Sequence, residues 1–181
     1  DDKLDEYCKK ADFVFNLAGV NRPQDPKEFR DGNFGFASTL LDVLKKNNNK
    51  APVMLSSSIQ ATLSGRFGSS EYGRSTKDGE EVFFEYARFP NLVGKWVRAN
   101  YNSAVGTFCN NIANDLPITI DDPGVELEML FVDDLVEEMF DALEGKEHHC
   151  EFDGVETLLC DNGRYCAAPI THKATLGYIV E

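Results

Sequence analysis

The pattern of hydrophobic and polar residues changes from segment to segment, and segments typical of buried strands follow segments typical of amphipathic helices. The run at 12–19, DFVFNLAG, is apolar and ends in small residues, which is typical of a buried parallel strand that opens onto a ligand site. Residues 25–47 carry apolar side chains at the spacing of one helix face, and Lys45 and Lys46 stand where cations favour the helix dipole. Residues 52–58, PVMLSSS, predict the next buried strand. The order strand, helix, strand predicts an adjacent parallel pair with a right-handed crossover.

The same alternation continues to the end of the chain. Helices are predicted over residues 72–87, 102–114 and 133–143. Strands are predicted over residues 126–132, 150–155 and 157–160. Asp133 and Asp134 are expected to cap the third helix, and Gly145 to end it. Thr171 is expected to cap one further helix. The pattern therefore predicts an α/β fold with a parallel sheet and flanking helices.

Composition narrows the classes of partner. The chain has 181 residues, of which 42% are hydrophobic, so it can bury one sizeable core and a single domain is the default. With 31 acidic and 18 basic residues, the net charge of -13 opposes binding to a phosphate backbone, and no nucleic-acid partner is expected. Apolar runs are too short for a bilayer, so no membrane partner is expected. The five cysteines are odd in number and scattered, which favours a cytoplasmic location.

Zinc-type ligands occur in the second half of the chain without a recognisable spacing. They are His148, His149, Cys150, Cys160, Cys166 and His172. The chain has no C-x-x-C pair and no tight histidine spacing, so these residues are expected to be ordinary strand and loop residues. No metal site is predicted.

An ordered set of short motifs resembles a known family. The motifs are NLAG at 16–19, a helix around Asn33 that ends in LLDVL, SSS at 56–58, YGRS at 72–75, RFPNL at 88–92 and VDD at 132–134. In this order they resemble the extended short-chain dehydrogenases, which include nucleotide-sugar epimerases and reductases. Three further motifs are NLVGKW at 91–96, NYNS at 100–103 and FCNNIA at 108–113. These are similar to bacterial capsular-polysaccharide reductases that act on UDP-linked 2-acetamido-2,6-dideoxy-4-keto sugars.

The resemblance implies a catalytic set in the stretch LSSSIQATLSGRFGSSEYGRSTKDGEE, residues 55–81. Ser58 matches the serine that orients the substrate carbonyl, and Tyr72 matches the tyrosine that gives the proton. The family's lysine, which lowers the pKa of that tyrosine, lies one helical turn later, where this chain has Thr76 and only then Lys77. One residue further along a helix is a rotation of about 100°, so Lys77 is expected to point elsewhere unless the turn is distorted. A weak catalyst and a Lys77 that reaches the site by its long stem both remain open.

The resemblance also implies a cofactor, NADP(H) or NAD(H), and a UDP-sugar substrate. The residues expected to bind the cofactor are Leu17, Ala18, Gly19, Pro90, Asn91 and Leu92. Those expected to bind the substrate are Asn100, Tyr101, Asn102 and Ser103. The glycine-rich turn that cradles pyrophosphate does not occur in this sequence. The expected fold is therefore an incomplete Rossmann-like parallel sheet that lacks the N-terminal glycine-loop strands and lacks a strand just before RFPNL. Weak NADPH binding is expected with it.

Residues 1–181 are thus expected to form a partial NAD(P)-binding domain, with a substrate-binding portion from about residue 100 onward. The expected function is that of an NAD(P)-dependent sugar-nucleotide reductase or epimerase, acting as a homodimer. The alternative is a non-catalytic oligomerising or ligand-binding module derived from the same fold. Taken singly, Ser56–Ser58 could be a polar strand end and Tyr72 an ordinary half-buried helix residue.

Overall fold

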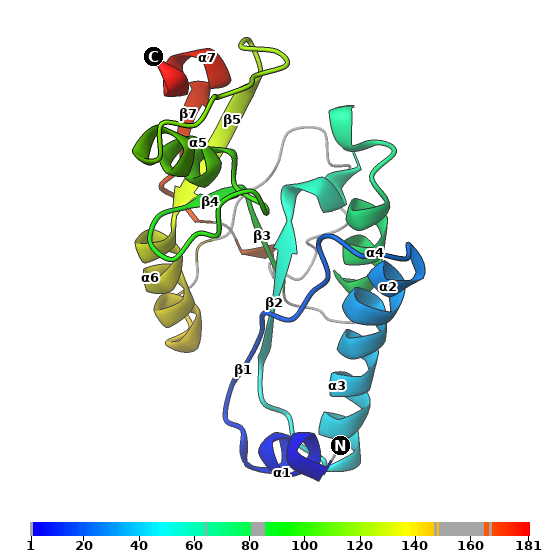
Figure 1. Cartoon of the computed structure of the whole chain (residues 1–181). Helices are drawn as coiled ribbons and strands as arrows, with labels where there is room; N and C mark the ends of the chain where they lie inside the picture. The colour runs from blue at the N-terminus through cyan, green and yellow to red at the C-terminus, as the bar shows by residue number, and fades with distance from the viewer. Residues whose placement is uncertain (1, 64, 81–85, 147, 149–164, 167) are drawn as a thin grey trace. The chain divides into compact units, whose positions relative to one another are not determined.

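The structure is a computed structural model that describes residues 2–63, 65–80, 86–146, 148, 165–166 and 168–181. The chain divides into two compact units (Figure 1). The first unit consists of Asp1–Arg88 and Glu147–Ala167, and the second of Phe89–Lys146 and Ala168–Glu181. Each unit has its own sheet, and the two are described separately below.

The sheet of the first unit has the strand order β1-β2-β3-β6. Strand β1 (Val14–Asn16) runs parallel to β2 (Val53–Ser58), with Val14 opposite Val53 and Asn16 opposite Leu55. This register confirms the predicted parallel pair. Strand β3 (Tyr86–Phe89) is parallel to β6 (Tyr165–Cys166). The carboxyl ends of β1 and β2 therefore meet at one edge of the sheet, where ligands bind in open α/β folds.

Helices precede and connect these strands. They are α1 (Asp2–Lys10), α2 (Lys27–Phe29), the π-helical segment η1 (Arg30–Gly35), α3 (Phe36–Lys46), the 3-10 turns η2 (Ile59–Thr62) and η3 (Gly65–Phe67), and α4 (Glu71–Glu80). The helix predicted over 25–47 is confirmed, with a π-helical turn inside it. A π turn holds one more residue than an α turn and often marks a functional site.

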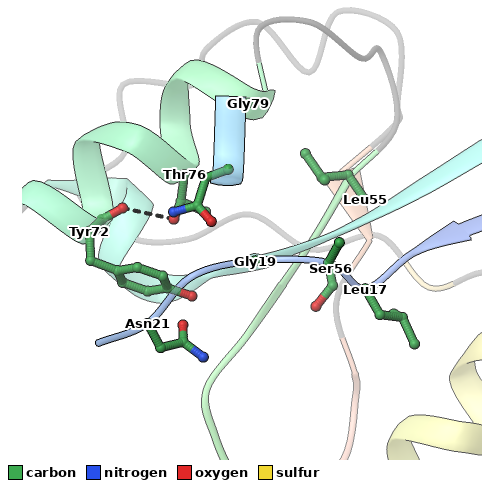
Figure 2. Close-up of a pocket in the computed structure, with 10 residues that line it drawn as sticks. Leu17, Gly19, Asn21, Leu55, Ser56, Tyr72, Thr76 and Gly79 are labelled. Atoms are coloured by element: carbon green, nitrogen blue, oxygen red, sulfur yellow. Dashed lines mark hydrogen bonds between the residues drawn. The ribbon is translucent and has the colours of Figure 1, made fainter. Parts of the chain in front are cut away.

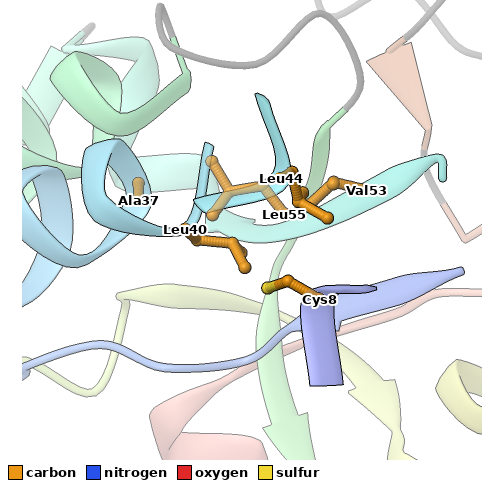
Figure 3. Close-up of a cluster of buried hydrophobic side chains, with 6 residues drawn as sticks. All are labelled: Cys8, Ala37, Leu40, Leu44, Val53 and Leu55. Atoms are coloured by element: carbon orange, nitrogen blue, oxygen red, sulfur yellow. The ribbon is translucent and has the colours of Figure 1, made fainter. Parts of the chain in front are cut away.

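The core of the first unit lies between α1, α3 and β2 (Figure 3). Leu40 and Leu44, four residues apart, present one face of α3, while Val53 and Leu55 present one face of β2. All four side chains are buried, together with Cys8 and Ala37. The hydrophobic effect thus holds α3 against the sheet. Because residues 17–35 connect β1 to α3, their position at the carboxyl end of β1 is restrained as well.

The second unit contains a mixed sheet of order β4-β5-β7. Its strands are β4 (Asn91–Val93), β5 (Glu126–Phe131) and β7 (His172–Thr175), and its helices are α5 (Ala104–Ala113), α6 (Val132–Leu143) and α7 (Leu176–Val180). Strand β5 is parallel to β4 and antiparallel to β7. Leu130 of β5 is fully buried. The predicted helix at 102–114 and strand at 126–132 are confirmed to within two residues.

Several predicted boundaries are wrong. The helix predicted over 72–87 does not reach residue 87, because Tyr86–Phe89 form β3, and the strand expected to be missing before RFPNL is therefore present. Pairing within the sheet decides this segment, since tyrosine and phenylalanine suit strands as well as helices. Helix α6 begins at Val132, so Asp133 and Asp134 lie in its first turn and do not cap it.

The last predicted helix start is also wrong. Thr171 precedes strand β7, and Thr175 caps α7 by accepting a hydrogen bond from the Tyr178 amide at 3.3 Å. The strands predicted at 150–155 and 157–160 lie outside the described residues. Among the helices that the structure describes, none is both long enough and apolar enough to cross a membrane.

Candidate functional site

A cavity of about 110 Å³ lies at the carboxyl ends of β1 and β2 in the first unit (Figure 2). Its lining comes from the loop after β1, from β2, from the π-helical segment and from α4. The lining residues are Leu17, Ala18, Gly19, Asn21, Asn33, Leu55, Ser56, Tyr72, Thr76 and Gly79. All of these residues are uncharged, so the cavity offers hydroxyl, amide and apolar groups to a ligand.

Helix α4 presents one face to the cavity. Tyr72, Thr76 and Gly79 lie at spacings of four and three residues, which places them on one side of a helix. Lys77 is half-buried and is not among the residues that line the cavity. At the start of the helix, a Cβ atom on Gly73 would lie 2.3 Å from the Gln60 carbonyl oxygen. Only glycine permits this close approach, which fixes the start of α4 against the turn that follows β2.

The environment of Tyr72 makes its hydroxyl a weak acid. Burial raises the pKa of Tyr72 above the ordinary 10.0, and hydrogen bonding by the hydroxyls of Thr76 and Ser58 opposes that rise. The Thr76 hydroxyl donates its single proton to the Tyr72 carbonyl oxygen at 2.7 Å (Figure 2), so of these two hydroxyls only that of Ser58 has a proton with which to stabilise a phenolate and oppose the rise. Tyr72 is therefore protonated at neutral pH and can donate a proton, but it is a weaker acid than an ordinary tyrosine.

Ser58 lies at the end of β2 and caps the turn that follows. Its hydroxyl accepts a hydrogen bond from the Gln60 amide at 3.2 Å. Its own proton is thus available for the Tyr72 oxygen, in keeping with its effect on the pKa of Tyr72. Ser58 does not line the cavity, whereas its neighbour Ser56 does.

Asn33, to which the sequence analysis assigned no role, joins three parts of the cavity wall. Its Oδ1 accepts from the Val20 amide at 2.8 Å, and its Nδ2 donates to the Ser75 hydroxyl at 2.9 Å and to the Val20 carbonyl oxygen at 3.4 Å. Ser75 in turn donates to the Tyr72 carbonyl oxygen at 3.0 Å, so it must accept from Asn33. Gly19 belongs to the same contact, because a Cβ atom there would lie 3.2 Å from Oδ1. Asn33 thus holds the loop after β1 against α4.

The remaining predicted site residues lie in the second unit. They are Pro90, Asn91, Leu92, Asn100, Tyr101, Asn102 and Ser103. The Asn91 side chain donates to the Glu128 carbonyl oxygen at 2.9 Å, and Ser103 caps α5 by accepting from the Gly106 amide at 3.1 Å. Asn100 has a positive φ of 56°, a conformation that asparagine tolerates. The Asn91 and Ser103 side chains thus support the local fold, and the roles of all seven residues toward a ligand remain predictions.

Comparison with known proteins assigns the chain to a family. No protein-family model matches the sequence. Over 150 residues it is 39% identical to the UDP-2-acetamido-2,6-beta-L-arabino-hexul-4-ose reductase of Pseudomonas aeruginosa, a match that covers 79% of this chain and 40% of that protein. The crystal structure of the capsular polysaccharide assembling protein CapF from Staphylococcus aureus matches 99% of this chain and 47% of that one, with 38% identity and a TM-score of 0.75. The chain belongs to the extended short-chain dehydrogenase/reductase family.

A solved structure of much lower sequence identity has the same fold. The UDP-glucuronic acid 4-epimerase from Bacillus cereus, solved in complex with NAD, is 17% identical to this chain, with a TM-score of 0.74. The match covers 96% of this chain and 58% of the epimerase chain. At this identity the likeness concerns the fold alone. This chain spans less than half the length of the P. aeruginosa reductase and of CapF. The predicted α/β fold with Rossmann-like parallel strands is confirmed.

Proposed function

We propose that this chain forms part of an NAD(P)-dependent sugar-nucleotide reductase or epimerase that reduces the keto group of a UDP-linked deoxy amino sugar in polysaccharide biosynthesis. The observation that carries the proposal is the cavity that joins Leu17–Gly19, after β1, to Tyr72 of α4. The 39% identity to a reductase of a UDP-linked hexulose supports the choice of substrate class. A homodimer and a cytoplasmic location remain predictions that accompany this function.

In the proposed reaction the protein binds the carbonyl, orients it and delivers a proton. The cofactor, NADP(H) or NAD(H), supplies a hydride when bound, and the uncharged wall formed by Leu17, Ala18 and Gly19 suits its nicotinamide ring. The Tyr72 hydroxyl gives its proton to the carbonyl oxygen, and the Ser58 hydroxyl hydrogen-bonds to the Tyr72 oxygen. Leu92 and its neighbours Pro90 and Asn91 are proposed on the nicotinamide and sugar side. Residues 100–103 are proposed for the nucleotide sugar.

The uncharged cavity favours a second candidate, a non-catalytic ligand-binding module. Burial raises the pKa of Tyr72, and no described lining residue carries a positive charge that would lower it. A tyrosine in this state transfers its proton slowly at neutral pH. The same cavity could therefore hold a ligand without turning it over. The two candidates differ in whether the Tyr72 hydroxyl takes part in a reaction.

Loss of the Tyr72 hydroxyl tests the proposal. Turnover of a UDP-linked 2-acetamido-2,6-dideoxy-4-keto sugar is followed by NADPH absorbance in the protein that carries this chain. Because a general acid contributes about 10²- to 10⁴-fold, Tyr72→Phe should lose that factor in kcat. The matched control, Tyr7→Phe, removes the hydroxyl of an exposed tyrosine in α1 and should retain the full rate. A Tyr72→Phe variant that turns over at the unmodified rate would refute the proposal, and a protein that binds the sugar without turnover would favour the binding module.

A further inference from the structure

We propose that Phe29 is a positioning residue for Tyr72: its ring packs against the tyrosine ring and keeps the phenol hydroxyl directed at the cavity. The two ring centroids lie 6.0 Å apart with an angle of 52° between the planes. This inference rests on the proposed function, in which Tyr72 delivers the proton. It adds a residue from α2, a segment that contributes nothing to the cavity lining among the described residues.

The backbone of Tyr72 is held by contacts that do not involve Phe29. Its carbonyl oxygen accepts from the hydroxyls of both Ser75 and Thr76, at 3.0 and 2.7 Å. The next residue, Gly73, packs directly on the Gln60 carbonyl. With the backbone fixed in this way, the place of the hydroxyl depends on the two side-chain torsions of Tyr72. A neighbour that restricts the ring therefore decides where the proton is delivered.

Phe29 is well placed to restrict that ring. Aromatic pairs attract each other at centroid distances of about 4.5–7 Å when the rings are tilted or offset, and the Phe29–Tyr72 pair lies inside that range. Phe29 ends α2, and four residues later Asn33 is tied to Ser75 of α4 at 2.9 Å. The segment from Phe29 to Asn33 thus meets α4 at two points, one apolar and one polar. The polar contact holds this segment beside α4, which keeps Phe29 within reach of the Tyr72 ring.

The chemistry around the pair is consistent with this role. Burial is the main cause of the raised pKa of Tyr72, and an apolar ring against the phenol contributes to that burial. No charged side chain is among the causes of that shift in the described structure. Arg30, next to Phe29, faces the ring of Phe34, with its guanidinium carbon 5.9 Å from the centroid. Phe29 is thus an apolar neighbour of the phenol, and the cation next to it in the sequence, Arg30, faces another ring.

The test measures the ionisation of Tyr72 directly. The protein is labelled with ¹³C at the tyrosine Cζ atoms, Tyr72→Phe identifies the resonance, and the pKa of Tyr72 is read from a pH titration. Phe29→Ala removes the ring and admits water, so the pKa of Tyr72 should fall toward its ordinary value. Phe29→Leu keeps apolar volume and should change the pKa less. Phe34→Ala, the matched control from the same segment, should leave it unchanged. Far-ultraviolet circular dichroism checks that each variant is folded.

A folded Phe29→Ala variant with the pKa of Tyr72 unchanged would overturn the inference, as would an equal shift in Phe34→Ala. If Phe29→Ala fails to fold, Phe29→Leu is compared with Phe34→Leu: a larger fall in the pKa of Tyr72 in Phe29→Leu supports the inference, and no difference between the two variants overturns it. Turnover separates this inference from the proposed function. With Tyr72 as the proton donor, Phe29→Ala should lower kcat about 10- to 100-fold with little change in KM, because the loss of the hydroxyl's position slows the chemical step more than the lower pKa of Tyr72 speeds it. A shift in the pKa of Tyr72 in a protein without turnover would keep Phe29 in its positioning role and reject the reductase function alone.

Discussion

Replacing Thr76 by lysine should turn Tyr72 into a better acid. Thr76 lines the cavity one helical turn after Tyr72, and side chains at this spacing lie about 5–6 Å apart at their Cβ atoms. A lysine ammonium about 5 Å from a phenolate stabilises it by about 3 kcal/mol at an effective dielectric constant of about 20. Each 1.4 kcal/mol is about a factor of ten in rate, so the gain in turnover at neutral pH should be about 10²-fold. The pKa of Tyr72 should fall in the same variant.

Lys77→Ala is the control for this change. Lys77 already supplies a cation in α4, but it is not a lining residue of the cavity, so its loss should affect neither the pKa of Tyr72 nor turnover. Titration of ¹³C-labelled tyrosine measures the first quantity, and NADPH consumption with a UDP-linked 4-keto sugar measures the second. If Thr76→Lys leaves both unchanged while Lys77→Ala abolishes turnover, the argument from the helix face is wrong and Lys77 is the catalytic lysine. If neither substitution changes turnover or the pKa of Tyr72, the non-catalytic ligand-binding module is the better description of this chain.

Three further predictions concern the scaffold of the cavity. Asn33→Ala removes two well-formed hydrogen bonds and a longer one, and should lower the free energy of unfolding by about 1–3 kcal/mol in urea titrations; a loss below about 0.5 kcal/mol would contradict its bridging role. Gly73→Ala places a methyl group against the Gln60 carbonyl and should destabilise by about 1–3 kcal/mol, more than Gly65→Ala, which has open space and only its positive φ of 53° to oppose it; equal losses would refute the close packing. Because burial raises the pKa of Tyr72, the unfolded chain loses the Tyr72 proton first as the pH rises above about 10, so the free energy of unfolding should decline from there up to the higher pKa of the folded state. Tyr72→Phe should remove this part of the decline, and an unchanged pH profile of stability in that variant would contradict the burial of Tyr72.

The sequence carried enough information for the arrangement around the cavity but not for its details. The apolar run at 12–19 and the strand at 52–58 predicted the parallel pair, because a buried run between turn residues leaves few alternatives. The 3.6-residue period also predicted that Thr76 and Lys77 point in different directions from α4, and of the two only Thr76 lines the cavity. Both inferences depend on local periodicity, which a single sequence displays directly.

Other features depend on partners far away in the chain. Tyr86 and Ala87 are predicted as the end of a helix, and only pairing in the sheet makes them part of strand β3. Asparagine has a low propensity for a helix interior, so the position of Asn33 is not favoured locally. No local pattern shows that its side-chain amide bonds to Val20 and Ser75, which lie 13 and 42 residues away. The π-helical turn that contains it was likewise not predicted. Short-range patterns locate elements, whereas tertiary contacts decide which polar side chain serves a site.

The central claim, that the cavity beside Tyr72 is the cofactor and proton-donor site of a sugar-nucleotide reductase or epimerase, is tested most directly by mapping the binding of NADPH. In an amide ¹H–¹⁵N correlation spectrum, NADPH should shift the resonances of Leu17, Ala18 and Gly19 together with those of Tyr72 and Thr76, because all five residues line one cavity. The same titration with Thr76→Lys should shift the same group of resonances. NADPH that leaves these resonances unmoved, or shifts only residues away from the cavity, would contradict the account.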